Sequence, residues 1–355
     1  PTGPSTGAWD EMQQTYARLA DWMGVTADEV VIGPSTTQNI YVLAHAARDI
    51  LGPGDAVVIT DGAHESNAGS WARLADAGVD VRIWPIDPET GSLTVEALRA
   101  VIDKDVAIVA FPEVSNLIGE PIDVAAVCAV IREAGAMSIV DGVAAAPHGL
   151  PWIDDLGCDI YLFSTYKTFG PHQGVMVVRT DTMAQLPNQG HYFNADQPHK
   201  RLVPAGPDHV QVAALQGVVD YLEAIDEHHF DTPATGRARA VRVHDLLRAA
   251  EAELMAPLMA FLTAREDVTV LGPSDPSVRV PTVAVRLDRV AADVTKRLGE
   301  RGVAAANGHF YSHRVTLAMG VNPERVLRLS FTHTTAPWEI ERVIAELTAI
   351  LDTPA

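Results

Sequence analysis

Residues 138–174, SIVDGVAAAPHGLPWIDDLGCDIYLFSTYKTFGPHQG, contain two short apolar runs that each end in polar residues. The first run, Met137 to Val140, leads directly to Asp141. The second, Ile160 to Phe163, leads to the segment STYK at 164–167 and then to a Gly-Pro break. Apolar runs of this length between turn residues are typical of buried strands in a parallel sheet. This stretch therefore predicts an α/β fold.

The two polar strand ends indicate a shared site. Function in open α/β sheets lies beyond the carboxyl ends of the strands, so we expect Asp141 and Lys167 at the same edge. Pyridoxal phosphate (PLP) chemistry needs such a pair: the lysine amine forms a Schiff base, and the carboxylate keeps the pyridine nitrogen protonated. The same spacing also fits a buried Asp–Lys ion pair in another kind of α/β enzyme. The two strands alone leave both interpretations open.

Two motifs in this stretch resemble a known signature. They are D-G-x-x-x-x-P-H, starting at Asp141, and S-x-x-K-x-x-G-P, starting at Ser164. Together they resemble the class V aminotransferases, especially the cysteine desulfurase-like branch, and the resemblance extends over roughly residues 15–350. It implies the PLP-dependent transferase fold type I, with a mostly parallel seven-stranded sheet flanked by helices. It also implies PLP as the cofactor and a homodimer as the assembly.

The rest of the chain fits this fold class, because apolar strands alternate with amphipathic helices. We expect a large PLP-binding α/β domain over residues 1–235 and a small C-terminal α+β domain over residues 236–355. The further strands are predicted at 30–32, 56–60, 79–85, 106–111, 282–287 and 326–331, and the main helices at 8–23, 40–50, 94–102, 124–134, 210–225, 238–262 and 291–301.

The composition is that of an ordinary globular enzyme. The chain has 355 residues, of which 47% are hydrophobic and 20% charged, which suffices for two domains. Its formal net charge of −20 argues against nucleic acid or anionic membranes as partners. No apolar stretch reaches the roughly 18 residues that cross a bilayer. We expect a cytoplasmic enzyme with an amino acid, a small molecule, as substrate, lacking the few dozen residues with which class V enzymes usually begin.

A hydroxyl-rich turn, GPSTTQ at 33–38, leads from the first strand into a helix. Free N–H groups and the helix dipole favour an anion at such a helix start, although an ordinary Ser/Thr cap has the same appearance. The resemblance implies that Thr36 and Thr37 bind the cofactor phosphate. We also expect Tyr166 to hydrogen-bond the phosphate together with Ser164; Tyr166 could instead simply pack.

The resemblance implies further roles along the chain. His64 follows the strand 56–60 and would cover the pyridine face, and Asn116 would hydrogen-bond the phenolic oxygen. Asn67 and Arg328 would contact the substrate, with Arg328 holding the α-carboxylate through a two-pronged hydrogen bond. By themselves, His64 and Asn116 could equally serve their own turns, and a lone arginine in a strand usually points to solvent. Lys167, Asp141 and His64 are the catalytic candidates, and no metal site is expected.

Several positions depart from the desulfurase pattern. Glu65 and Tyr166 each replace a histidine, and Ala144 replaces a glutamine. The loop 307–311, NGHFY, stands where desulfurases carry a mobile cysteine, whereas Cys128 and Cys158 lie elsewhere. Because a persulfide needs a thiolate at that loop, the sequence favours transamination or C–S lyase-type β-elimination, with racemisation also open. The alternatives are a cysteine desulfurase or selenocysteine lyase-like activity, and a non-catalytic PLP-binding regulator.

Overall fold

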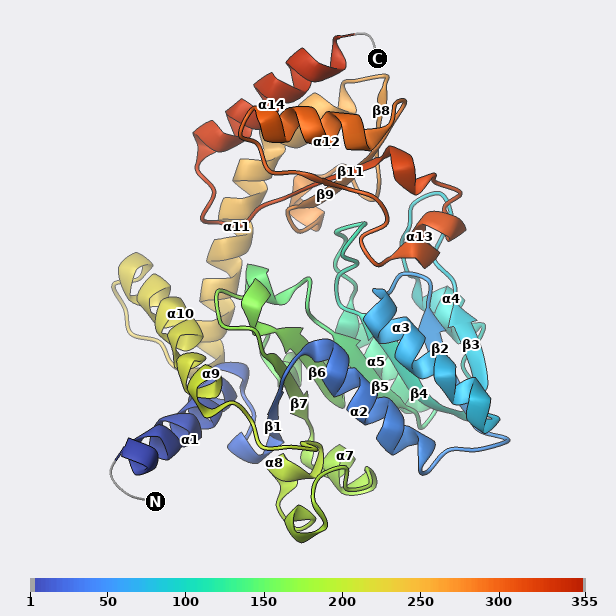
Figure 1. Cartoon of the computed structure of the whole chain (residues 1–355), viewed down its shortest axis with the longest axis vertical. Helices are drawn as coiled ribbons and strands as arrows, with labels where there is room; N and C mark the ends of the chain where they lie inside the picture. Colours follow the sequence, from blue (N-terminus) through green and yellow to red (C-terminus); the bar gives the residue numbers. More distant parts are fainter. Residues whose placement is uncertain (1–3, 354–355) are drawn as a thin grey trace.

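The computed structural model describes residues 4–353 and contains two β-sheets (Figure 1). The large sheet has seven strands in the order β1-β7-β6-β5-β4-β2-β3. These strands are β1 (Val30–Gly33), β2 (Ala56–Thr60), β3 (Asp80–Trp84), β4 (Val106–Pro112), β5 (Met137–Asp141), β6 (Ile160–Ser164) and β7 (Gly174–Val178). The mostly parallel seven-stranded sheet that we expected is confirmed.

Only β7 runs against its neighbours in this sheet. It pairs antiparallel with β6 on one side and with β1 on the other, whereas β2 to β6 pair in parallel. Asp141 is paired with Pro112 of β4 and with Leu162 of β6. The carboxyl ends of β4, β5 and β6 therefore meet at one edge, as the parallel arrangement requires.

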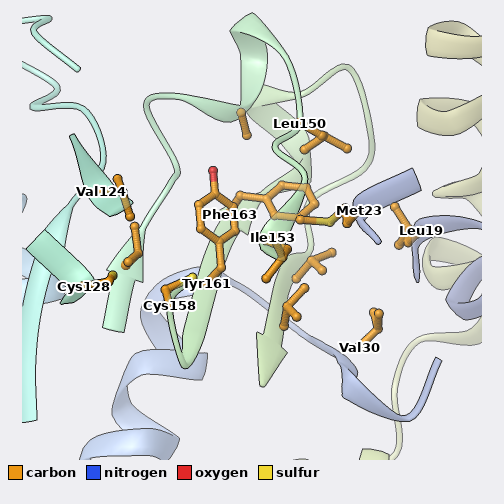
Figure 2. Close-up of a cluster of buried hydrophobic side chains, with 14 of the residues drawn as sticks. Leu19, Met23, Val30, Val124, Cys128, Leu150, Ile153, Cys158, Tyr161 and Phe163 are labelled. Atoms are coloured by element: carbon orange, nitrogen blue, oxygen red, sulfur yellow. The ribbon is translucent and has the colours of Figure 1, made fainter. Parts of the chain in front are cut away.

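Helices cover both faces of the large sheet. They are α1 (Pro4–Met23), α2 (Thr36–Arg48), α3 (Glu65–Ala72), α4 (Val95–Arg99), α5 (Val124–Glu133), α6 (Ile153–Leu156), α7 (Thr180–Gln185), α8 (Pro198–Arg201), α9 (His209–Ala214) and α10 (Gln216–His229). Alternate residues of each strand point to opposite faces. Tyr161 and Phe163 of β6 thus pack with α1 and α5 (Figure 2), whereas Ile160 and Leu162 pack with α2 and α3.

The smaller sheet forms the second layer of the molecule, at the top of Figure 1. Its order is β10-β11-β9-β8, and every pair is antiparallel. Its elements are β8 (Val268–Val270), β9 (Thr282–Leu287), β10 (Ala306–Asn307), β11 (Val326–Ser330), α12 (Ala291–Glu300), α13 (His313–Ala318) and α14 (Pro337–Leu351). This agrees with the α+β organisation expected for the C-terminal part.

Helix α11 (Gly236–Thr263) connects the two layers (Figure 1). Ala240, Val243 and Leu247 belong to the core of the large sheet. Met255, Leu258 and Met259 belong to the core of the small sheet. One helix thus contributes to both hydrophobic cores, which couples the two layers mechanically.

Several of the predicted helices differ in their bounds from those observed; α1 begins four residues earlier than expected, and α4 ends at Arg99 rather than at residue 102. The helix expected at 210–225 is divided into α9 and α10, with Leu215 between them. The helix expected at 40–50 begins earlier, at Thr36, because Ser35 caps it. None of the helices in the described part of the chain is long and apolar enough to span a membrane.

Candidate active site

A cavity at the carboxyl edge of the large sheet brings together all the predicted cofactor-binding residues. Its lining consists of Thr36, Thr37, His64, Ser66, Pro112, Val114, Asn116, Asp141, Val143, Ala144, Ser164, Tyr166 and Lys167. These residues come from the ends of β4, β5 and β6 and from the starts of α2 and α3. Residues far apart in the sequence are therefore gathered at the edge where parallel sheets carry their sites.

The start of α2 forms a polar cradle on one side of this cavity. The hydroxyls of Thr36 and Ser164 are 2.8 Å apart, which joins the helix to the end of β6. Gly174 is required here, since a Cβ on it would lie 2.3 Å from backbone atoms of Ser35 and Thr36. The first N–H groups of a helix have no partner within the helix, so this end presents donors and a positive dipole to the cavity. Such a cradle suits a phosphate.

Asp141 is a buried carboxylate at the end of β5. It is only 5% exposed, and the backbone N–H of Val143 donates to its Oδ1 at 3.0 Å. Burial raises the pKa of Asp141, while the Val143 hydrogen bond and the charge of Lys167 act in the opposite direction. A carboxylate in this position can stabilise a nearby positive charge.

Lys167 ends the single 3-10 turn (Thr165–Lys167) that follows β6. Burial lowers the pKa of Lys167; the charge of Asp141 raises it and that of Arg328 lowers it. A lowered pKa increases the fraction of free amine, which is the nucleophilic form. Several groups with shifted pKa values in one cleft are typical of functional sites.

His64 is held with its ring over the cavity. It caps α3, and its Nδ1 accepts a hydrogen bond from the backbone N–H of Ser66 at 3.1 Å. Burial, and then the charges of Lys167 and Arg328, lower the pKa of His64 to about 4. The ring is therefore neutral at neutral pH. It lies 5.4 Å from the ring of Tyr311, which belongs to the loop 307–312.

A second cavity, of about 270 Å³, adjoins the first and shares Asn116, Val143, Ala144 and Lys167 with it. It is also lined by Arg328, Pro147, His148, Thr282, Ser330, Phe331 and Thr332. Arg328 does not point to open solvent. Its Nη1 donates to the carbonyl of Asn116 at 2.9 Å, and its guanidinium lies 4.1 Å from the ring centroid of Phe310. Burial lowers the pKa of Arg328.

Asn67 is the one predicted site residue that lines neither cavity. It is fully buried, and its Oδ1 accepts from the indole N–H of Trp71 at 3.3 Å. Its Nδ2 has no hydrogen-bond partner among the described residues. The predicted contact between Asn67 and the substrate therefore gains no support from the geometry.

The loop 307–312 engages the side chain of Asn116. Asn116 Nδ2 donates to the carbonyl of Phe310 at 2.9 Å, and Ser312 Oγ donates to Asn116 Oδ1 at 2.5 Å. Phe310 and Tyr311 both have positive φ, at 52° and 59°, which is strained for bulky side chains. This loop therefore contacts a residue that lines both cavities, and the side-chain amide of Asn116 is occupied by these two hydrogen bonds.

The sequence did not lead us to expect the hydrogen-bonded pair Glu113 and Tyr161 near Asp141. Tyr161 Oη donates to Glu113 Oε2 at 2.6 Å. Burial and the charge of Asp141 raise the pKa of Glu113 to about 7, against the lowering effect of the Tyr161 hydrogen bond. A Cβ on Gly142 would lie 2.0 Å from Tyr161 Oη. The glycine of the D-G motif was the available signal, because it marks this close approach.

The two cysteines lie inside the core of the large sheet (Figure 2). Cys128 is on α5, and Cys158 precedes β6. Burial raises the pKa of Cys128 to about 11 and also raises the pKa of Cys158. Neither thiol lines the two cavities, so both are poorly suited to act as nucleophiles.

The chain is similar in sequence to a known family and to known proteins. The sequence profile of the family described as Aminotransferase class-V matches residues 4–236. The chain is 30% identical to the "Aminotransferase-like protein FGM3" of Gibberella zeae, over 98% of this chain and 84% of that protein. It is 29% identical to a cysteine desulfurase of Yersinia pestis (strain Pestoides F), over 86% of this chain and 74% of that protein.

The fold also resembles that of a solved structure. The apo cysteine desulfurase from Thermococcus onnurineus NA1 superposes with a TM-score of 0.86. The two chains are 21% identical, and the match covers 99% of this chain and 86% of that one. At this identity the likeness concerns the fold alone.

Proposed function

Because the chain belongs to the class-V aminotransferase family, we propose that it is a PLP-dependent enzyme that acts on an amino acid in the two adjoining cavities. The observation that carries this proposal is that Lys167 lines both of them. One holds the cradle and Asp141, and the other holds Arg328. A cofactor and an amino acid would thus have neighbouring compartments, with the lysine amine between them.

The residues of the first cavity fit PLP. Thr36, Thr37 and Ser164, with Tyr166 beside them, would hold the phosphate at the start of α2. His64 would cover the ring, and Asp141 would pair with the pyridine nitrogen. Lys167 would attach the cofactor, and Asn116 would reach the phenolic oxygen once the loop 307–312 releases its amide. Bound PLP supplies an electron sink for bonds at the substrate α-carbon.

The chain's own residues would then bind and deprotonate the substrate. Arg328 would hold the α-carboxylate, because its fork of N–H donors matches two carboxylate oxygens. The free amine of Lys167, with its pKa lowered by burial, is the group that takes and returns the α-proton. Asp141 would pair with the pyridine nitrogen of the bound cofactor and keep it protonated.

Transamination or C–S lyase-type β-elimination suits this site better than persulfide formation. The loop 307–312 has no thiol, and both cysteines are buried in the core with raised pKa values. Desulfuration of the persulfide type therefore ranks second, supported by the resemblance to cysteine desulfurases. A non-catalytic PLP-binding regulator ranks below both.

One experiment separates these activities. The purified protein with PLP is mixed with a panel of amino acids, with and without a keto-acid acceptor. Repeated release of keto acid and ammonia, beyond one equivalent per bound PLP and without an acceptor, indicates elimination. Release of one equivalent, with conversion of the cofactor to its amine form, indicates transamination. The proposed function is wrong if PLP does not bind, or if no amino acid changes the cofactor spectrum.

The remaining proposals concern assembly and location. We propose a homodimer, supported by a largely apolar cavity of about 920 Å³ on the part of the surface that includes Gly206, lined in part by Tyr41, Val42, Leu202 and Pro204. Light scattering at micromolar concentration tests it, and an active monomer would contradict it. We further propose a cytoplasmic location and a domain division at residues 235/236.

A further inference from the structure

The second cavity contains an ionisable residue to which the proposed function gives no role. Only three of its lining residues have ionisable side chains: Lys167, Arg328 and His148. His148 ends the short 3-10 turn (Ala146–His148) that follows Asp141 in the chain, and it is 5% exposed. No aspartate or glutamate lines this cavity among the described residues.

A fully buried carboxylate fixes the ring of His148. Glu251 of α11 is 0% exposed, and its Oε1 lies 2.8 Å from His148 Nδ1. Arg248 donates to its Oε2 at 3.1 Å, and the backbone N–H of His333 donates to its Oε1 at 3.3 Å. Burial alone would raise the pKa of Glu251, but its hydrogen bonds to His148 and His333 and the charge of Arg248 lower it to about 2. Glu251 is therefore ionised and can only accept hydrogen bonds.

The ionised carboxylate decides which ring nitrogen of His148 is free. Since Glu251 only accepts, His148 Nδ1 must carry a proton and donate it. Nε2 makes no hydrogen bond to any described residue, and it is the nitrogen left for the cavity that His148 lines. A carboxylate that accepts a hydrogen bond from one ring nitrogen of a histidine fixes the tautomer and the orientation of the ring.

We propose that His148, oriented by Glu251, is the specificity-determining residue that hydrogen-bonds the substrate side chain through Nε2. This inference rests on the proposed function. If Lys167 faces the amino group and Arg328 holds the carboxylate, the side chain lies among the remaining lining residues, of which His148 is the only ionisable one. The substrate is accordingly an amino acid with a polar, hydrogen-bonding side chain rather than an aliphatic one.

The physical basis is the cost of leaving a buried polar group unpaired. A site built to hydrogen-bond a substrate rejects an analogue that lacks the bonding group, because its own polar atom then loses water without gaining a partner. A purely structural His148–Glu251 pair between the 3-10 turn and α11 would affect all substrates equally. The two roles are therefore separable by measuring selectivity.

The test uses amino acid pairs of similar size: cysteine with 2-aminobutyrate, aspartate with leucine, and serine with alanine. The kcat/KM ratio of polar to apolar partner is measured for PLP-loaded wild type and for two variants. His148→Asn offers an amide donor near the position of Nδ1 but nothing at Nε2, whereas His148→Gln offers an amide near the position of Nε2. His228→Asn, at the exposed end of α10, is the matched control.

We expect wild type to prefer the polar member of at least one pair by about tenfold or more. His148→Asn should reduce that preference at least about tenfold, His148→Gln should restore part of it, and the control should match wild type. Thermal unfolding and the spectral change on substrate binding accompany each variant. A preference that is unchanged in His148→Asn, or a wild type that prefers the apolar members, overturns this inference. A wild type that responds to no amino acid overturns the proposed function itself, and this inference with it.

Discussion

Lys167 and Arg328 line the same cavity although they come from different sheets. Lys167 follows β6 of the large sheet, and Arg328 lies within β11 of the small one. The link between them runs through Asn116, whose carbonyl accepts from Arg328 Nη1 and whose side chain lines both cavities with Lys167. The relative position of the two layers therefore sets the distance from the amine to the guanidinium, and with it the amino acids that fit.

Asp141→Asn should lower kcat by about a hundredfold or more, which corresponds to roughly 2.7 kcal/mol of lost transition-state stabilisation. The substitution keeps the size of the side chain and removes the charge that would hold the pyridine nitrogen protonated. It should also lower the pKa of Lys167 further, because the charge of Asp141 raises that pKa. Steady-state kinetics and a spectroscopic pH titration of the lysine-linked cofactor measure both effects. Unchanged kcat with PLP bound would contradict the role given to Asp141.

Arg328→Lys should raise KM for the amino acid at least about tenfold, because a lysine cannot make the two-pronged contact with a carboxylate. PLP affinity should stay within about twofold of wild type, since Arg328 lines the second cavity and not the first. Arg286→Lys, on the neighbouring strand β9, is an exposed control and should leave both values unchanged. Equal effects of the two substitutions would show that Arg328 does not hold the substrate.

The raised pKa of Glu113 should make the free energy of unfolding fall as the pH rises towards neutral. Its pKa is raised from about 4.5 to about 7 in the folded protein, so the folded state keeps a proton that the unfolded state releases. The free energy of unfolding should therefore fall as pH rises from about 4.5 to 7, by at most about 3 kcal/mol because Glu113 is partly exposed. Glu113→Gln should remove this decline. Chemical denaturation at several pH values measures it, and an identical pH dependence in the variant would refute the assignment.

The double substitution Cys128→Ala and Cys158→Ala should leave kcat within a few-fold of wild type. Both thiols are buried in the core, so the expected cost is stability, about 1 kcal/mol for each residue. Kinetics with the best substrate and thermal unfolding of the same sample separate the two effects. A loss of activity beyond about a hundredfold, with the fold intact and PLP bound, would return persulfide chemistry to first place.

The site residues at strand ends were predictable from the sequence, whereas the residues that position them were not. Asp141 and Lys167 follow apolar runs, and a polar residue after a buried strand must emerge at the sheet edge. The sequence does not show why residue 174 must be glycine. A side chain there would collide with the backbone of Ser35 and Thr36, which are distant in sequence. The burial of Glu251 could not be predicted either, because a charged residue in a long helix is usually exposed to solvent.

Some helices and strands were also not predictable from the sequence. The strand β7 was not predicted, although its residues GVMVV are apolar, because it follows the irregular Gly-Pro segment closely. Asn67 could be assigned only by resemblance, and its burial against Trp71 depends on the orientation of α3. The break between α9 and α10 at Leu215 has no physical explanation in the sequence or in the local contacts.

The most direct test of the account is to reduce the PLP-loaded protein with borohydride and to map the modified peptide by mass spectrometry. The chain has four lysines, Lys104, Lys167, Lys200 and Lys296, and only Lys167 lines the cavity with Asp141. The account predicts a cofactor adduct on Lys167 in wild type and no adduct in Lys167→Ala, while Lys104→Ala behaves as wild type. An adduct on Lys104, Lys200 or Lys296, or no adduct on the loaded wild-type protein, would contradict it.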